Sequence, residues 1–388
     1  MFIEHLKEKL SAPSSKRGEK MPNPIEKRKT NHIRICIEEN VKARQATTGF
    51  EDIFLVHRAL PEIERDKINL STKVFNHKLS APLIVEAMTG GTAETAKINM
   101  AIAEAVEELG LGMGVGSQRA AIENPKLENT FAVARKKAPT AFLIANIGAP
   151  QLVREYSVAQ AKRAVEMIDA DALAIHLNPL QEVIQPEGET NYVGVLEKIR
   201  EMTQALDVPV IAKETGTGIA VEEAKMLEAA GAAGIDVAGV GGTSWAAVEY
   251  HRAKKLQDKF RQKLGEDFWD WGIPTAASLV EVVQSVNLPV IASGGVRSGI
   301  DIAKSLALGA SLAGMASPIL RPATKDSNKV KKALQFIIEE LKNTMFLVGA
   351  ESTQKLRKAP LVLTGKTAEW LRMRGFQLER YARRRESG

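Results

Sequence analysis

The sequence has almost no cysteine and no long hydrophobic run. Its single cysteine, Cys36, excludes an intrachain disulfide in the 388 residues and fits a reducing compartment. No stretch approaches the roughly 18 apolar residues of a membrane span. The charged N-terminus also lacks the apolar core of a secretory signal. We therefore expect a cytoplasmic protein with no membrane partner, and the 44% of hydrophobic residues can form a large core.

The net charge of +6 is not spread over the chain. Residues 1–30 and 372–388 each carry a net charge of +4, so the rest of the chain is slightly acidic. Basic ends such as "RYARRRESG" are more often solvated than bound to a partner. The sequence therefore predicts no nucleic-acid partner for the folded part.

Short apolar runs recur along residues 81–325, and each ends in glycine or in polar residues. They begin near residues 82, 111, 141, 172, 208, 233, 288 and 311, with helical patterns such as "AKINMAIAEAVEELG" between them. Eight strand–helix units with apolar strands predict an α/β fold, a closed parallel TIM (β/α)8 barrel. The alternative is an open doubly wound sheet. The absence of a dinucleotide fingerprint makes that alternative weaker.

The flanks of this barrel differ from it in composition. Residues 1–21 mix charge, serine and proline and are expected to be a disordered leader. Residues 22–80 contain short strand-like pieces such as "IFLVH" and predict a strand-containing N-terminal extension. Residues 326–388 predict C-terminal helices and a basic tail. A long connection after Gly242 holds three of the four tryptophans, and we expect it to be a lid or a subunit contact.

Polar residues gather at the ends of the predicted strands, where such barrels place their active sites. Each one alone could be a helix cap or a turn residue, but all eight strand ends carry them. They are Met88, Thr89 and Gly90; Ser117, Gln118 and Arg119; Asn146; His176 and Asn178; Lys213 and Glu214; Gly241, Gly242 and Thr243; Ser293 to Arg297; and Ala313 and Gly314.

Two of these strand ends predict a phosphate cradle. "SGGVRSG" and "LAGMA" follow the seventh and eighth strands, where barrels commonly bind phosphate on backbone N–H groups. Lys213 ends the apolar run "VPVIAKETG" and has three interpretations. It could be a Schiff-base nucleophile, it could stabilise a bound anion, or it could pair structurally with Glu214.

The stretch "AIHLNPLQEVIQPEGE" crowds polar groups behind an apolar run. A hard cation such as Mg²⁺ takes one or two carboxylates and often a substrate phosphate. Glu182 therefore predicts a metal that bridges the protein and a diphosphate, although it could be a solvated loop carboxylate. His176 could likewise be a buried histidine whose hydrogen bonds are already satisfied.

Taken together, these motifs resemble the type 2, FMN-dependent isopentenyl-diphosphate delta-isomerases, the archaeal members most closely. The resemblance covers nearly all of residues 22–380. It rests on "EKRKTNHI", "MTGGT", "MGVGSQRAAIE", "ANIGAPQLV", "AIHLNPLQEVIQPEGE", "AKETGTGI", "GVGGTSW", "WGIPTAAS", "SGGVRSG" and "LAGMA".

This resemblance implies a role for each matching residue. Gln181, His176, Asn178 and Lys213 would be catalytic, and Glu182 would bind Mg²⁺. The residues that would bind the diphosphate substrate are Arg28, Lys29, Ser117, Gln118, Arg119 and Gln181, so residues 22–80 would contribute to substrate binding. Those that would bind FMN are Ala87, Met88, Thr89, Ser117, Asn146, Lys213, Thr243, Gly294, Gly295, Val296, Arg297, Ala313 and Gly314.

The resemblance also implies a reaction, the shift of a double bond between isopentenyl and dimethylallyl diphosphate in isoprenoid biosynthesis. Reduced FMN would be the acid–base group, and NADPH would reduce it beforehand. The implied assembly is a homo-oligomer, a tetramer or an octamer. The alternative is an FMN-dependent barrel oxidoreductase, which would need a cysteine, serine or histidine base. Cys36 precedes the barrel and no His-Gly-x-Arg element occurs.

Overall fold

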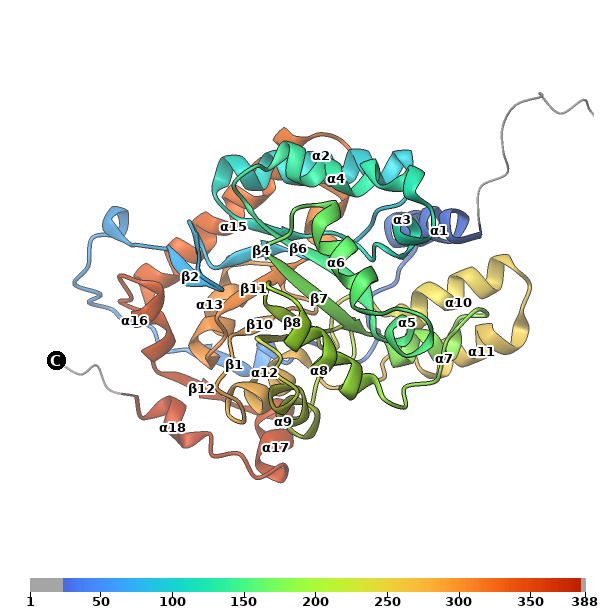
Figure 1. Cartoon of the computed structure of the whole chain (residues 1–388). Coiled ribbons are helices and arrows are strands. Elements are labelled where there is room, and N and C mark those ends of the chain that lie inside the picture. Colours follow the sequence, from blue (N-terminus) through green and yellow to red (C-terminus); the bar gives the residue numbers. More distant parts are fainter. Residues whose placement is uncertain (1–23, 385–388) are drawn as a thin grey trace, which may run out of the picture.

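Eight parallel strands form a closed barrel in the computed structural model, which describes residues 24–384. The leader expected at residues 1–21 lies outside the described residues. The strand order around the barrel is β10-β11-β4-β5-β6-β7-β8-β9, which confirms the predicted TIM barrel. Helices enclose these strands (Figure 1). The strands are β4 (Leu83–Val85), β5 (Gly112–Gly114), β6 (Phe142–Gly148), β7 (Ala172–Leu177), β8 (Val210–Glu214), β9 (Gly234–Asp236), β10 (Val290–Ala292) and β11 (Leu312–Met315).

Helices follow every barrel strand and surround the barrel. After β4 to β7 come α2 (Ala93–Leu109), α3 (Arg119–Glu123), α4 (Asn129–Lys137), α5 (Ala149–Arg154), α6 (Val158–Met167), α7 (Pro179–Ile184) and α8 (Val195–Ala205). After β8 to β11 come α9 (Val221–Ala229), α10 (Trp245–Lys255), α11 (Lys259–Asp267), α12 (Thr275–Val283), α13 (Gly299–Leu308), α14 (Ser317–Ala323) and α15 (Ser327–Leu347). The tryptophan-rich connection forms the hairpin α10–α11, while α12 returns to the barrel wall.

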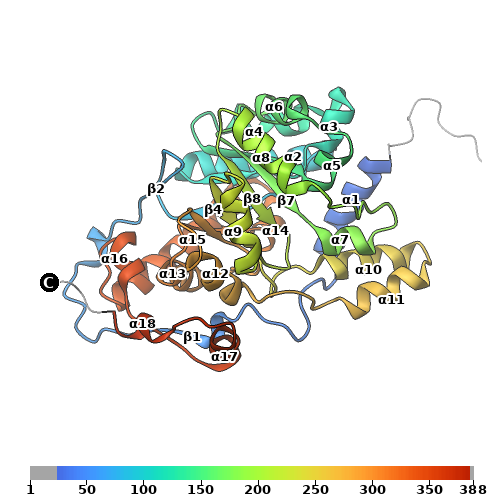
Figure 2. The same ribbon diagram turned by 60° about the horizontal axis from the view of Figure 1, so that its bottom comes forward.

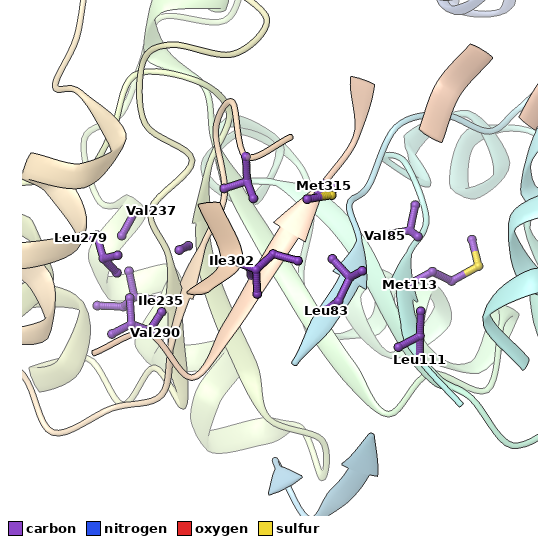
Figure 3. Close-up of a cluster of buried hydrophobic side chains, with 14 of the residues drawn as sticks. Leu83, Val85, Leu111, Met113, Ile235, Val237, Leu279, Val290, Ile302 and Met315 are labelled. Atoms are coloured by element: carbon purple, nitrogen blue, oxygen red, sulfur yellow. The ribbon is translucent and has the colours of Figure 1, made fainter. Parts of the chain in front are cut away.

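Successive side chains along each strand point alternately into the barrel and toward the helices, so they form two apolar layers. Inside the barrel, Phe142 and Ile144 of β6 pack with Ile211 of β8 and with residues of β4, β7, β10 and β11. Outside it, the intervening positions face the helices (Figure 3). There Leu83 and Val85 of β4 belong to the same cluster as residues of β5, β9, α12 and α13. The helix-facing layer therefore fixes the register of every strand.

Short elements close the end of the barrel where the strands begin. The hairpin of β2 (Thr72–Val74) and β3 (His77–Leu79) places Phe75 against Phe142, with ring centroids 6.0 Å apart. β1 (Ile53–Leu55) pairs antiparallel with β12 (Leu361–Leu363), so the two flanks of the chain join. With this end plugged by apolar side chains, the opposite end is left for chemistry.

The C-terminal region is helical, as the sequence predicts. Here α15 runs along the barrel against α2 and α13. It is followed by α16 (Thr353–Lys358), α17 (Gly365–Met373) and α18 (Glu379–Ala382). Single turns of 3-10 helix lie at Phe50–Asp52, Arg65–Lys67 and Pro125–Leu127.

One helix is not foreseen from the sequence. Residues 22–80 suggest strands, yet α1 (Pro24–Glu38) begins the described chain and packs against α10 and α14. Both views place α1 beside the α10–α11 hairpin, on the far side of the molecule from α17 and α18 (Figure 1, Figure 2). Within residues 24–384, no helix is both long and apolar enough to cross a membrane.

Candidate active site

A cavity of about 260 Å³ opens at the end of the barrel where the strands finish. Its walls come from the loops after the barrel strands, from α1 and from the start of α14. Three kinds of surface line it. They are charged and amide side chains in or just after β4, β6, β7 and β8, glycines in the loops after β9 and β10 and in β11, and basic side chains of α1. This position is the usual one for the active site of such a barrel.

The polar floor of the cavity continues the inward-facing rows of the strands. Asn146 lies two residues beyond Ile144, and Lys213 two residues beyond Ile211. Because successive side chains of a strand alternate, both polar groups point into the barrel above the apolar layer. His176 pairs in register with Lys213, and Lys213 with Asp236, so the three side chains lie next to one another.

Lys213 is held by two buried carboxylates. Its Nζ lies 2.6 Å from Oδ2 of Asp236 and 2.9 Å from Oε2 of Glu86. Burial alone would lower the pKa of Lys213, but these two charges outweigh it and raise the pKa, so the ammonium form persists. Glu214 does not pair with Lys213. Its carboxylate accepts backbone N–H bonds from residues 215–217 instead, which removes the structural Lys–Glu pair from the three interpretations.

His176 is a neutral hydrogen-bonding group in this site. Its Nδ1 lies 2.8 Å from Oδ1 of Asn146. Burial lowers the pKa of His176 to about 4, helped by the charges of Lys213, Lys29 and Arg28. A neutral imidazole that donates from Nδ1 to an amide oxygen keeps an unprotonated Nε2 as acceptor.

Glu182 is fixed by donors from its own loop. Pro179 opens α7, and the helical spacing brings Asn178 within 2.7 Å of Oε1 of Glu182. Oε2 accepts from Nε2 of Gln185 at 2.6 Å and from the backbone N–H of Glu189 at 2.7 Å. Gln181 stands beside this carboxylate on the same helix and also lines the cavity. The described residues contain no group of three or more metal-ligating His, Cys, Asp or Glu side chains.

Basic residues approach the cavity from two elements. On α1, Lys29 donates from Nζ to the carbonyl of Ser117 and lies 5.0 Å from the ring centre of Phe131. Burial, with a smaller contribution from Arg28, lowers the pKa of Lys29 to about 7. Arg119 begins α3 and pairs with carboxylates at 2.7 Å and 3.1 Å. These cations face a region with room for an anion.

The opposite end of the cavity is made of glycine. A Cβ added to Gly242 would lie 2.5 Å from the backbone N of Gly295, and one on Gly294 would lie 2.2 Å from the carbonyl O of Gly239. Gly294 has φ +94°, which side chains rarely adopt. The loops after β9 and β10 thus pack backbone against backbone and form a cradle, an arrangement that can offer peptide N–H groups to an anion.

The cavity brings most of the predicted residues together. Lining it are Arg28, Lys29, Ala87, Met88, Thr89, Ser117, Arg119, Asn146, His176, Asn178, Gln181, Glu182, Lys213, Thr243, Gly294, Gly295, Val296, Arg297 and Gly314. Two predicted residues lie behind it. Gln118 is fully buried and bonds Ala164 O at 2.7 Å and Asn146 N at 2.8 Å, and Ala313 is fully buried in β11. Gln118 therefore holds β6 in place from below.

Sequence reasoning missed several residues of the site. Glu86 and Asp236, the partners of Lys213, stand inside the apolar runs "LIVEAM" and "GIDVAG". A lone carboxylate in such an apolar run indicates a buried partner of opposite charge, because burying a carboxylate unpaired is costly. This signal could have identified both residues. His32 also lines the cavity and lies 2.9 Å from Glu249 of α10. Its place depended on α1, which the sequence did not indicate.

Comparisons with known proteins agree on one group of relatives. A family profile described as "FMN-dependent dehydrogenase" matches residues 23–175 and 191–363. Relatives named isopentenyl-diphosphate delta-isomerase include that of Methanosarcina barkeri, 51% identical over 93% of this chain and 98% of the relative. That of Methanothermobacter thermautotrophicus is 52% identical over 93% and 99%. That of Pyrococcus furiosus is 52% identical over 92% and 91%.

Solved structures of similar shape share the barrel. A mandelate oxidase R163L with 2-hydroxy-phenylacetamide superposes with a TM-score of 0.60 at 20% identity, over 88% of this chain and 98% of that one. A mandelate oxidase with the C4a-OH-FMN adduct gives a TM-score of 0.58 at 20% identity, over 88% and 99%. At this identity the likeness establishes the fold only.

Proposed function

Because the chain belongs to the isopentenyl-diphosphate delta-isomerase family, we propose that it interconverts isopentenyl and dimethylallyl diphosphate for isoprenoid biosynthesis. FMN would be the bound cofactor, Mg²⁺ would help to hold the diphosphate, and NADPH would supply the reducing equivalents that prime the flavin. The observation that carries the proposal is one cavity with a glycine cradle at one end and Lys29, Arg119 and Glu182 at the other.

The glycine cradle fits the phosphate of FMN. Any side chain on Gly242 or Gly294 would collide with backbone atoms, so at these two positions a ligand can be recognised only through peptide groups. Gly295, Arg297 and Gly314 complete it and add one positive charge. The floor residues Thr89, Asn146 and Lys213 offer hydrogen-bond donors and acceptors for a planar, amide-like ring. Reduced FMN would supply an acid–base group that exchanges a proton with the alkene without net redox change.

The cations at the other end fit a diphosphate. Arg28 and Lys29 of α1 and Arg119 of α3 can each give a charge-assisted hydrogen bond to phosphate oxygen, worth about 1.5–3 kcal/mol. Glu182 would be the single protein carboxylate on Mg²⁺, which usually keeps several waters and takes the rest of its oxygens from phosphate. Holding the diphosphate in this way supplies binding energy away from the reacting carbon.

Residues between these two ends would act on the alkene. Gln181 would lie beside the migrating double bond, while the neutral imidazole of His176 and the amide of Asn178 orient that part of the substrate. Lys213 would stabilise negative charge on the reduced cofactor, in the manner of other preorganised charges. We also propose a homo-oligomer, in which the exposed Phe260 and Trp271 of the α10–α11 region are available for contact.

One assay tests the proposed reaction. The protein is loaded with FMN, reduced once by NADPH without oxygen, and given isopentenyl diphosphate and Mg²⁺. We expect many molecules of dimethylallyl diphosphate per flavin, because substrate and product are isomers. If each product consumed one NADPH, the reaction would be an oxidoreduction and the barrel oxidoreductase alternative would stand instead.

A further inference from the structure

Three charged side chains form a closed group at the cavity floor. Lys213 contacts Glu86 at 2.9 Å and Asp236 at 2.6 Å, and all three residues are at least nine-tenths buried. We call these residues the charge triad. With both carboxylates ionised, the triad carries a net charge of −1 next to the place proposed for the flavin ring. That sign opposes the role of Lys213, which is to stabilise negative charge there.

The two carboxylates of the triad are not equally provided with hydrogen bonds. Asp236 accepts from Lys213 and from the hydroxyl of Ser293, so both of its oxygens have a donor. Glu86 accepts from Lys213 through Oε2, while its Oε1 is buried without a hydrogen-bond partner within the described chain. A carboxylate with fewer donors is the easier one to protonate. Glu86 also lines the cavity, and Asp236 does not.

Among the described residues, the charges that act on Glu86 are those of Lys213 and Asp236. Facing it are Lys213 of β8 and Asp236 of β9, whereas the neighbouring β5 and β11 carry no titratable residue. Oε1 of Glu86 packs against Gly314 of β11, where a Cβ would lie 1.9 Å from it. Burial and the charge of Asp236 raise the pKa of Glu86.

We propose that Glu86 takes up one proton when the FMN bound over Lys213 is reduced, and so acts as a positioning residue for the charge of that lysine. The proposal rests on FMN being the cofactor. With the oxidised, neutral ring, Glu86 is ionised and the triad has its net charge of −1. Reduction of the bound ring by two electrons, with one proton added, would leave it negatively charged. The negative ring would then lie beside a triad of net charge −1. Glu86 therefore takes one proton from solvent, which leaves the triad neutral and Lys213 free to face the ring.

The pH dependence of the flavin midpoint potential measures this proton. The FMN-loaded protein is titrated with a chemical reductant and reference dyes from about pH 6 to about pH 9. Each proton taken up in a two-electron reduction changes the potential by about 30 mV per pH unit. Near pH 8, above the raised pKa of Glu86, we expect about 60 mV per pH unit for the wild type, which is two protons, and about 30 mV for Glu86→Gln.

Two further variants test the assignment of the proton to Glu86. In Asp236→Asn, Glu86 is the remaining carboxylate on Lys213 and stays ionised throughout, so the slope should also be about 30 mV per pH unit. Glu249→Gln removes another buried carboxylate, one that pairs with His32 and Arg252 outside the triad. That control should keep the wild-type slope. An unchanged slope in Glu86→Gln would overturn the proposal.

A measurement on the unaltered protein covers the case in which the variants fail to fold. Protons absorbed from a weakly buffered solution are counted with an indicator dye while the bound flavin is reduced near pH 8, and the absorption spectrum shows whether the reduced flavin is anionic or neutral. Two protons per flavin with an anionic reduced flavin support the inference. One proton, or two protons with a neutral reduced flavin, contradicts it. A protein that binds no FMN refutes the proposed cofactor, whereas a protein that binds FMN and takes up a single proton refutes only the role of Glu86.

Discussion

The two ends of the cavity are built from different chemical groups. At one end, the loops after β9 and β10 meet through glycines, and backbone atoms form much of the surface. At the other end, side chains of α1, α3 and α7 form it, and each is held by hydrogen bonds or ion pairs to its neighbours. We call them the glycine end and the side-chain end.

This difference separates the two ways of recognising phosphate that we propose. The glycine end would offer fixed peptide dipoles and has no room for an added side-chain atom, so recognition there should fail abruptly when the backbone is disturbed. The side-chain end would use separate cations and a carboxylate, whose contributions can be lost one at a time. Perturbing residues at each end should therefore give effects of different size and kind.

The largest effect is expected at the glycine end. In Gly294→Ala the new Cβ would meet the carbonyl O of Gly239 at 2.2 Å, and the backbone has φ +94°. The conformational strain alone costs about 1–3 kcal/mol, and the contact must push the two loops apart. We expect the dissociation constant for FMN to rise by at least about tenfold, measured by flavin fluorescence quenching on the apoprotein.

Gly194→Ala is the matched control for this substitution. Gly194 also has a positive φ, +87°, but a Cβ there meets no atom within 4 Å, and the residue lies away from the cavity lining. It should lose stability to the strain and keep FMN affinity. Equal loss of FMN in both variants would show that the backbone strain, and not the close packing of the cradle, governs binding.

A smaller effect is expected at Glu182, within the side-chain end. Glu182→Gln keeps the size of the group and removes the charge that a hard cation prefers. We expect bound FMN to be retained while the Mg²⁺ concentration for half-maximal activity rises and the rate falls, each by about tenfold. A Mg²⁺ titration of activity in wild type and variant measures both changes.

Glu182 also holds its own loop, so a second variant must separate the two roles. Gln185→Ala removes one donor to Oε2 but leaves the carboxylate in place. If Glu182 binds the metal, this variant should need a Mg²⁺ concentration close to that of the wild type. Matching defects in the two variants would assign Glu182 to loop structure alone.

The contrast between the ends also explains how much the sequence could predict. Apolar runs ending in glycine mark the strands and the glycine end directly, because both depend on local sequence. Lys213 was found in the same way, but its partners Glu86 and Asp236 come from other strands, 127 and 23 residues away along the chain. Such pairings depend on barrel closure, and no local pattern encodes them.

Gln118 shows that local sequence can also predict a site residue that does not line the cavity. It follows a strand end, as Ser117 does, and so it was predicted to bind substrate. In the structure its amide turns down to bond Ala164 and Asn146, and it supports the floor of the cavity instead of lining it. Position along the chain therefore located the polar cluster, but which side chains of that cluster face the ligand is decided by packing.

Lys29 gives the side-chain end a pH dependence. Its lowered pKa of about 7 in the free protein means that its charge is present below that pH and is lost as the pH rises. We expect the KM for the diphosphate to increase above about pH 7 in the wild type, and by about tenfold overall in Lys29→Ala, with FMN content unchanged.

A comparison with Lys29→Arg isolates this lysine from the ionisation of the substrate. Arginine stays charged at every accessible pH. Any pH dependence of KM that remains in that variant therefore comes from the titration of the substrate. The wild-type KM should rise relative to Lys29→Arg as the pH increases. Parallel pH profiles would place the titrating group elsewhere.

The smallest effect is expected at the rim, and it has the opposite sign. Glu187 lies 3.4 Å from Arg28 and 2.6 Å from Arg252, and its side chain is 39% exposed. The diphosphate must compete with this carboxylate for Arg28, and an exposed ion pair contributes about 0–1 kcal/mol. Glu187→Gln should therefore lower KM, by up to about fivefold at low ionic strength.

This decrease in KM should become smaller in added salt, because screening also weakens the ion pair of the wild type. A higher KM in the variant would mean that Glu187 orients Arg28 toward the substrate, and the side-chain end would then be as cooperative as the glycine end.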